Sequence, residues 1–172
     1  MILENILNSD MDPSDMIYSE KVDGVRAFWD GKHLTCKQGI KINAPHDFIR
    51  QLPTDIMLDG ELCLKQGCIE ECLSIVQTLK PDGRWENIKY QVFDTPNSNG
   101  GILQRLEYVH DKIGKDCKSV TILHHGVCKN KSHFLELMRS LGSSERGKGI
   151  MLRNPTSPYD FSNFCVLLEV IN

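Results

Sequence analysis

Asp-Gly pairs are the feature that most constrains how this chain can fold. They occur at Asp23-Gly24, Asp30-Gly31, Asp59-Gly60 and Asp82-Gly83. Because Asp-Gly favours tight turns between strands, we expect a strand over residues 18–27 that is interrupted at Asp23-Gly24. Asp30-Gly31 then predicts a hairpin with residues 33–36 as its second strand. The first part of the chain is therefore expected to be antiparallel sheet.

Apolar spacing predicts the remaining elements. In chain order they are a strand over 57–64, a helix over 69–79, a strand over 88–93, a loop over 95–101, a helix over 102–113, a strand over 120–124, a helix over 134–141 and strands over 150–153 and 166–171. Gly142 is expected to end the last helix as a C-cap. Strands and helices do not alternate regularly, so the predicted fold class is α+β with mainly antiparallel sheets.

Composition excludes several classes of protein. Apolar residues make up 40% of the 172 residues and charged residues 25%, as in ordinary globular domains. No apolar run reaches the length of a membrane span, and the N-terminus does not resemble a signal peptide, so we expect an intracellular protein without membrane contact. The net charge of −3 limits any nucleic-acid binding to a local basic patch.

The cysteines and histidines do not form a convincing metal motif. The seven cysteines are an odd number, which favours free thiols in a reducing compartment. The groups nearest to a ligand cluster are Cys63, Cys68 and Cys72, and His124, His125 and Cys128. Neither group has the paired C-x2-C spacing of a zinc site. We interpret them as buried cysteines and surface histidines.

Lys21 stands in a dense run of charged residues, Lys21-Val22-Asp23-Gly24-Val25-Arg26. Such a run at a turn is usually a solvated surface. A lysine becomes a nucleophile only when burial or nearby positive charge lowers its pKa. Attack on phosphorus would also require cations, a carboxylate for a metal and an aromatic surface for a base. Arg26, Glu61 and Phe93 are of these types, but spacing alone does not bring them together.

The run around Lys21 matches the K-x-D-G-x-R signature of the covalent nucleotidyltransferases, namely DNA ligases, RNA ligases and mRNA capping enzymes. Further segments follow in the order of that family: Leu58-Asp59-Gly60-Glu61-Leu62, Tyr90-Gln91-Val92-Phe93-Asp94, Gly149-Ile150-Met151-Leu152-Arg153 and residues 167–171. With Ala44-Pro45, Asn154-Pro155 and Ser157-Pro158-Tyr159, the chain resembles the adenylation domain of the small ATP-dependent DNA ligases of bacteria and viruses. The upstream segment Asp10-Met11-Asp12-Pro13 also fits, so the N-terminus is expected to be complete.

The resemblance implies a nucleotidyltransferase fold with antiparallel sheets around a nucleotide cleft, ATP as cofactor and Mg2+ or Mn2+. Lys21 would attack the α-phosphate of ATP, and AMP would then pass to the 5′-phosphate of a nick in duplex DNA, as in repair, recombination and replication. Arg26 and Glu61 would hold the ribose and phosphate side, with Glu61 also serving the metal. Phe93 would stack on adenine, and Glu20 would lie at its edge.

Three positions depart from the family pattern. Lys148 stands where a metal-binding glutamate is expected, and Glu169 and Ile171 stand where two phosphate-binding lysines are expected. In one interpretation the domain has decayed and its activity is impaired. In the other, Lys148 and Glu169 are a reciprocal exchange that keeps the local charge.

The chain ends at Asn172, so we expect residues 1–172 to be an adenylation domain without the small oligonucleotide-binding barrel of the family. We expect a monomer, and a separate partner could supply the barrel. Two alternative functions stay open. The chain could be a pseudoenzyme that binds a nucleotide or nucleic acid without catalysis, or it could be an RNA ligase.

Overall fold

The computed structural model describes residues 12–64, 69–113, 117–142, 147–161 and 166–169. Its strands are β1 Ile17–Val22, β2 Val25–Trp29, β3 Leu34–Cys36, β4 Leu58–Leu64, β5 Ile88–Asp94, β6 Val120–Ile122, β7 His125–Val127, β8 Gly147–Arg153 and β9 Val166–Glu169. Its helices are α2 His46–Ile49, α3 Ile69–Val76, the 3-10 helix η1 Gly83–Asn87, α4 Ile102–Lys112 and α5 Lys131–Gly142.

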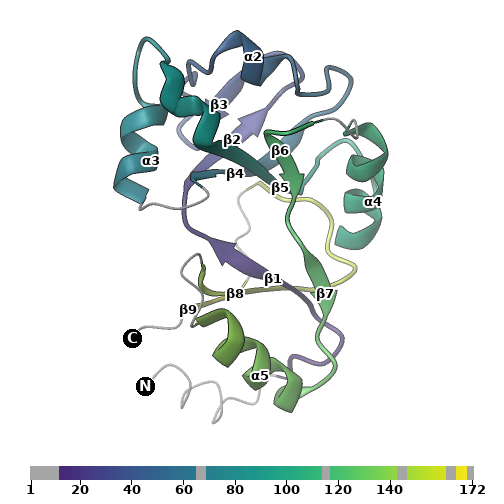
Figure 1. The fold of residues 1–172 in the computed structure, drawn as a ribbon. Coiled ribbons are helices and arrows are strands. Elements are labelled where there is room, and N and C mark those ends of the chain that lie inside the picture. The colour runs from purple at the N-terminus through teal and green to yellow at the C-terminus, as the bar shows by residue number, and fades with distance from the viewer. Residues whose placement is uncertain (1–11, 65–68, 114–116, 143–146, 162–165, 170–172) are drawn as a thin grey trace.

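The described strands form two sheets. One has the order β7-β1-β8-β9, and the other has the order β3-β2-β4-β5-β6. Every strand pair is antiparallel except β5 with β6, which is parallel. In Figure 1 the four-stranded sheet lies in the lower half of the molecule with α5 beneath it, and α2, α3 and α4 surround the five-stranded sheet above.

Each sheet has its own hydrophobic core. The larger core covers the five-stranded sheet and includes Trp29, Leu58, Tyr90 and Val109, all of which are buried. The smaller core lies between the four-stranded sheet and α5 and consists of Cys128, Phe134, Met138, Ile150 and Leu152. Ile17, Ile102 and Leu106 form a third small cluster. Because Ile17 is on β1 and the other two are on α4, this cluster contributes apolar contacts between the two halves.

Gly24 lies in the turn where the chain passes from one sheet to the other. A Cβ atom there would collide with the carbonyl oxygen of Leu62 and would lie 2.9 Å from Cγ of Glu61. Glycine therefore lets β1 leave the four-stranded sheet and β2 join the other while staying packed against β4. The predicted interruption at Asp23-Gly24 is confirmed, and the structure adds that its two sides belong to different sheets.

The α+β prediction is confirmed, together with most of its strands and helices. The sequence missed β7, α2 and η1, which are short and have little apolar periodicity. Helix α5 begins at Lys131 and not at residue 134, and Gly142 is still within it. The last predicted strand is described only to Glu169. Within the described residues, none of the helices combines the length and the apolarity that crossing a membrane requires.

Candidate functional site

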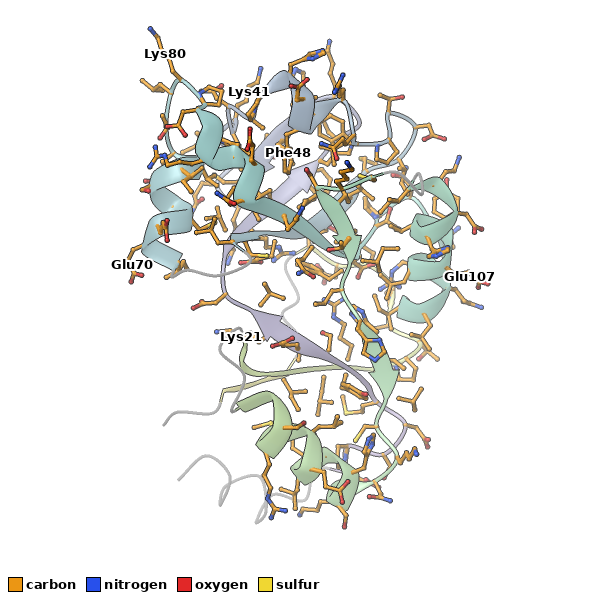
Figure 2. The ribbon with its side chains drawn as sticks, viewed as in Figure 1. Lys21, Lys41, Phe48, Glu70, Lys80 and Glu107 are labelled. Carbon is orange, nitrogen blue, oxygen red and sulfur yellow. The ribbon has the colours of Figure 1, made fainter. Side chains whose placement is uncertain are left out.

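Lys21 lies near the end of β1, close to the point where the chain leaves the four-stranded sheet (Figure 2). The pairing of β1 with β8 is irregular at this residue, because Glu20 pairs with Ile150 but Val22 pairs with Gly147. One residue of β1 thus lies opposite two of β8, which is a β-bulge. Bulges often lie beside active sites, where they redirect a side chain.

Glu61, the predicted metal-binding carboxylate, lies on β4. It pairs with Arg26 on β2, and its charge interacts with those of Arg26, Asp23 and Lys21. Burial raises the pKa of Glu61 from 4.5 to about 7, although the positive charge of Arg26 opposes this shift. A carboxyl group with this pKa changes its protonation near neutral pH, which is common at functional sites.

The guanidinium group of Arg26 contacts a carboxylate and an aromatic ring. Its Nε lies 3.1 Å from Oδ1 of Asp59 and its Nη2 lies 2.7 Å from Oδ2, a bidentate pair. The Tyr159 hydroxyl donates a hydrogen bond to the same Asp59 carboxylate at 3.0 Å. The Arg26 Cζ atom lies 4.7 Å from the centroid of the Phe161 ring. Tyr159 and Phe161 follow β8, so the segment after β8 reaches across to the five-stranded sheet.

Phe93, at the end of β5, has two guanidinium groups near its ring. The Cζ atom of Arg26 lies 5.6 Å from the ring centroid, and that of Arg153 on β8 lies 5.3 Å from it. These distances are within the range of cation–π attraction. Arg26 and Arg153 come from different sheets, so the ring of Phe93 lies where the two halves of the molecule meet.

Asp94, the residue after Phe93, is bound by two arginines. Arg105 on α4 makes a bidentate pair with it, with Nε to Oδ1 at 2.7 Å and Nη2 to Oδ2 at 3.0 Å. The Nη1 atom of Arg153 donates to Oδ2 of Asp94 at 3.0 Å. Arg105 is 2% exposed and Asp94 is 5% exposed. Such burial is tolerated for charged groups only when they are paired.

A cavity of about 350 Å³ lies beside these groups. The charged and aromatic residues in its lining include Arg26, Asp59, Phe93, Asp94, Arg105, Arg153 and Tyr159. Its size is within the range of pockets that take small molecules, and a planar ring beside cations suits a nucleobase and its phosphates. The described residues at this site therefore fit a nucleotide.

The structure brings four of the predicted residues into a connected series. Lys21 interacts electrostatically with Glu61, Glu61 with Arg26, and Arg26 lies over the ring of Phe93. Glu20 is on β1 and pairs with Ile150. The backbones of Gly149 and Glu169 are paired, so position 148 lies on β8, next to β1, and position 169 lies on β9, on the far side of β8. Ile171 lies outside the described residues.

Sequence reasoning assigned no role to six residues of this site, which are Asp59, Asp94, Arg105, Arg153, Tyr159 and Phe161. For Arg105 a signal was present. Helix α4 buries Ile102, Arg105, Leu106 and Val109, so an arginine occupies a position on the apolar stripe of the helix. A charged residue at such a position requires a buried partner.

The interpretation of His124 and His125 as surface residues is wrong for His125. Its Nδ1 atom lies 2.7 Å from the carbonyl oxygen of Leu123, and its Nε2 atom is buried. Burial lowers the pKa of His125 to about 4, and the nearby positive charge of Arg153 acts in the same direction. His125 is therefore a neutral, partly buried side chain, whereas His124 is exposed. The described cysteines, Cys36, Cys63, Cys72, Cys117 and Cys128, are free thiols.

The described residues contain no group of three or more His, Cys, Asp or Glu side chains placed to hold a metal ion. Magnesium at nucleotide sites is usually bound by one or two carboxylates together with the phosphates of the substrate. Glu61, with the charge of Asp23 nearby, fits that more modest requirement. The residues present are thus compatible with a metal that enters with the nucleotide.

Comparison with known proteins relates both the sequence and the fold to DNA ligases. No protein-family model matches the chain. The DNA ligase of Haemophilus influenzae is 33% identical over 155 residues, which cover 90% of this chain and 57% of that protein. A solved structure of a Lig E DNA ligase, from work on DNA binding with a minimal scaffold, matches with a TM-score of 0.82 at 25% identity. The match covers 94% of this chain and 64% of the Lig E chain. The structure of the adenylated DNA ligase of Chlorella virus matches with a TM-score of 0.73 at 20% identity. This match covers 97% of this chain and 63% of the viral ligase chain.

The chain has the fold of the nucleotidyltransferase domains of DNA ligases, and its sequence is similar to that of a DNA ligase. It is similar to the adenylation domains of ATP-dependent DNA ligases, among them the small Lig E and Chlorella virus ligases. The chain spans less than two thirds of the length of each of these proteins.

Proposed function

We propose that the chain is an ATP-dependent nucleotidyltransferase that adenylates itself on Lys21 and transfers AMP to the 5′-phosphate at a nick in duplex DNA. The observation that carries this proposal is the connected series Lys21, Glu61, Arg26 and Phe93, in a chain similar to a DNA ligase. Arg26 and Phe93, at one end of this series, line a cavity of nucleotide size. That the chain acts as a monomer, and that another protein supplies an oligonucleotide-binding barrel, stay predictions from the sequence.

In the proposed first step, Nζ of Lys21 loses its proton and attacks the α-phosphorus of ATP. A P–N bond forms, the bond to the bridging oxygen breaks, and pyrophosphate leaves. Arg26 and Glu61 would contact the ribose and phosphate side, Glu61 would also hold Mg2+ or Mn2+, and Phe93 would stack on adenine. A divalent metal would neutralise charge on the phosphates, and such transfers depend mainly on positioning and charge neutralisation.

Lys148 and Glu169 support the further proposal that activity is impaired. Position 148 lies on β8 at the bulge opposite Lys21, and position 169 lies on β9, the strand on the other side of β8. Lys148 replaces a carboxylate that would bind the metal, and Glu169 replaces a lysine that would bind phosphate. Both changes remove charge-assisted contacts, which lower the activation barrier of phosphoryl transfer in sites that exclude water.

Self-adenylation tests the proposal directly. The protein is incubated with ATP labelled at the α-phosphate and with Mg2+ or Mn2+ over a range of concentrations, and covalent label is measured after denaturation. We expect slow labelling that is lost in Lys21→Ala and kept in Lys32→Ala, a control with an exposed lysine in the hairpin after β2. Label that persists in Lys21→Ala would contradict the assignment of the nucleophile.

A non-catalytic nucleotide-binding protein is the second candidate, and the departures at Lys148 and Glu169 favour it. It predicts no label on the parent chain at any metal concentration, together with saturable ATP binding in calorimetry. Binding lost in Phe93→Ala would then locate the nucleotide in the cavity beside that ring.

The choice of DNA follows from the relatives, which are named as DNA ligases. An RNA ligase is the remaining alternative. Competition between nicked duplex DNA and nicked duplex RNA for the transfer of AMP from the labelled protein separates the two. Preference for RNA would overturn the assignment of the acceptor but not that of Lys21.

A further inference from the structure

We propose that Arg105 is a positioning residue for adenylyl transfer, which acts through Asp94 to fix the base-stacking ring of Phe93 relative to the strands that carry Lys21. This inference rests on the proposed function and adds a residue to its machinery. Arg105 lies on α4, away from the segments that resemble the nucleotidyltransferase motifs.

Nucleotide geometry sets the requirement that Arg105 would meet. The distance from adenine to the α-phosphorus of a bound nucleotide varies little, so Phe93 and Lys21 must be held at a matching separation. Phe93 belongs to the five-stranded sheet, and Lys21 belongs to β1 of the four-stranded sheet. A rigid link between the two sheets near Phe93 would therefore affect the rate of attack, because catalysis is sensitive to misplacements of about 1 Å.

The carboxylate of Asp94 provides that link. It follows Phe93 directly in β5 and accepts a hydrogen bond from Nη1 of Arg153, which is on β8. The same Nη1 lies 3.4 Å from the carbonyl oxygen of Phe93. Strand β8 pairs with β1 on both sides of Lys21. The contact between Asp94 and Arg153 thus connects the residue beside the stacking ring to the strand beside the nucleophile.

Arg105 holds this carboxylate in place. Its bidentate pair with Asp94 uses both carboxylate oxygens, and its Nη1 donates to the carbonyl oxygens of Gly100 at 2.6 Å and Ser157 at 2.8 Å. Gly100 precedes α4, and Ser157 lies in the segment that follows β8. One buried guanidinium therefore joins α4, the end of β5 and the segment after β8.

Two arginines share Asp94, and both line the nucleotide-sized cavity. Because a bidentate guanidinium fixes the plane of a carboxylate, Arg105 leaves Oδ2 oriented toward Arg153. Arg153 in turn lies over Phe93. Loss of Arg105 would free Asp94 to rotate and would loosen the contact between the sheets at the stacking ring.

The test separates positioning from stability by comparing Arg105→Met, Arg105→Lys and Val109→Ala. Val109 is buried on the same helix, so its truncation destabilises α4 without touching Asp94. The first-order rate of Lys21 labelling is measured at saturating ATP and at a temperature well below the lowest unfolding midpoint. Ground-state binding is measured with α,β-methylene-ATP, which cannot transfer its adenylyl group to Lys21.

We expect Arg105→Met to lower the labelling rate roughly 10- to 100-fold while the dissociation constant for α,β-methylene-ATP changes far less. Arg105→Lys, which keeps the charge but loses the bidentate geometry, should retain an intermediate rate, and it serves as the test if the methionine variant does not fold. Val109→Ala should label at the parental rate despite a lower midpoint.

The inference would be overturned if the Arg105 variants labelled Lys21 at the same rate as Val109→Ala. It would also be overturned if the only effect of the Arg105 variants were weaker binding of α,β-methylene-ATP. Absence of label on the parent chain would overturn the proposed function, and the inference with it. That result is recognisable because it involves no variant.

Discussion

Replacement of Glu61 by glutamine should stabilise the fold at alkaline pH and leave its stability unchanged in acid. Glu61 is a largely buried carboxyl group whose pKa burial raises from 4.5 to about 7. Glutamine has nearly the same shape and carries no charge at any pH. The variant therefore removes the cost of ionising this side chain inside the folded protein.

The sign of the effect follows from proton binding. Between pH 4.5 and about 7 the folded state holds the proton of Glu61 more tightly than the unfolded state does. The contribution of Glu61 to stability is therefore complete below about pH 4.5 and declines as pH rises through 7. The shift of the Glu61 pKa from 4.5 to about 7 corresponds to a loss of at most roughly 3 kcal/mol in the free energy of unfolding, at about 1.4 kcal/mol for each pKa unit. Partial access of solvent reduces the expected gain to about 2 kcal/mol at pH 8.

Urea unfolding followed by tryptophan fluorescence at several pH values between 4.5 and 8.5 gives the free energy of unfolding of both proteins. Their difference isolates Glu61 from the other groups that titrate. Glu86→Gln is the matched control, because Glu86 is exposed on η1 and should show no such trend. Adenylation of Lys21 should fall in Glu61→Gln, so greater stability would accompany lower activity.

Parallel stability profiles for Glu61→Gln and the parent across this pH range would refute the reasoning. They would mean that Glu61 is ionised in the fold at the same pH as in the unfolded chain. A gain that appears equally at pH 4.5 and pH 8 would also contradict it, because that result requires a cause other than charge.

Three further predictions follow from packing and charge at other positions. Gly24→Ala should lower stability by about 2 kcal/mol or more, because its Cβ would collide with the Leu62 carbonyl oxygen; an unchanged denaturation midpoint would contradict this contact. Tyr90→Phe should lower the free energy of unfolding in urea by about 1–3 kcal/mol. The reason is that the buried hydroxyl donates to one of two backbone carbonyl oxygens, at 2.9 and 3.0 Å. A change smaller than experimental error would show that these hydrogen bonds do not contribute to stability. Lys148→Glu combined with Glu169→Lys should raise the labelling rate of Lys21 roughly tenfold or more if these positions limit activity. No rise would show that they do not, and full restoration by either single change would exclude compensation between them.

Much of the fold could be predicted from local sequence. Asp23-Gly24 and Asp30-Gly31 located the turns on either side of β2, and apolar spacing located α3, α4 and most of the strands. Short elements such as β7 were missed because three residues carry too little periodicity to be recognised. The parallel pairing of β5 with β6 could not be predicted either, because strand pairing depends on contacts between residues that are distant in sequence.

The candidate site was predicted only in part. The order of motifs singled out Lys21, Arg26, Glu61 and Phe93, and the structure places these residues in one connected series. The partners of the charged groups were not predictable. Asp59 is part of the same motif as Glu61, but nothing local indicates that it binds Arg26 and Tyr159.

The sequence by itself determined where the chain turns, which segments are strands or helices, and which lysine stands in the nucleotidyltransferase signature. Those properties depend on a few neighbouring residues. Tertiary structure alone decided that β1 and β2 enter different sheets, that Asp94 is shared by Arg105 and Arg153, and that Glu61 is buried enough to titrate near neutral pH. The reason is physical, because burial and charge pairing depend on the groups that folding brings together from distant parts of the chain.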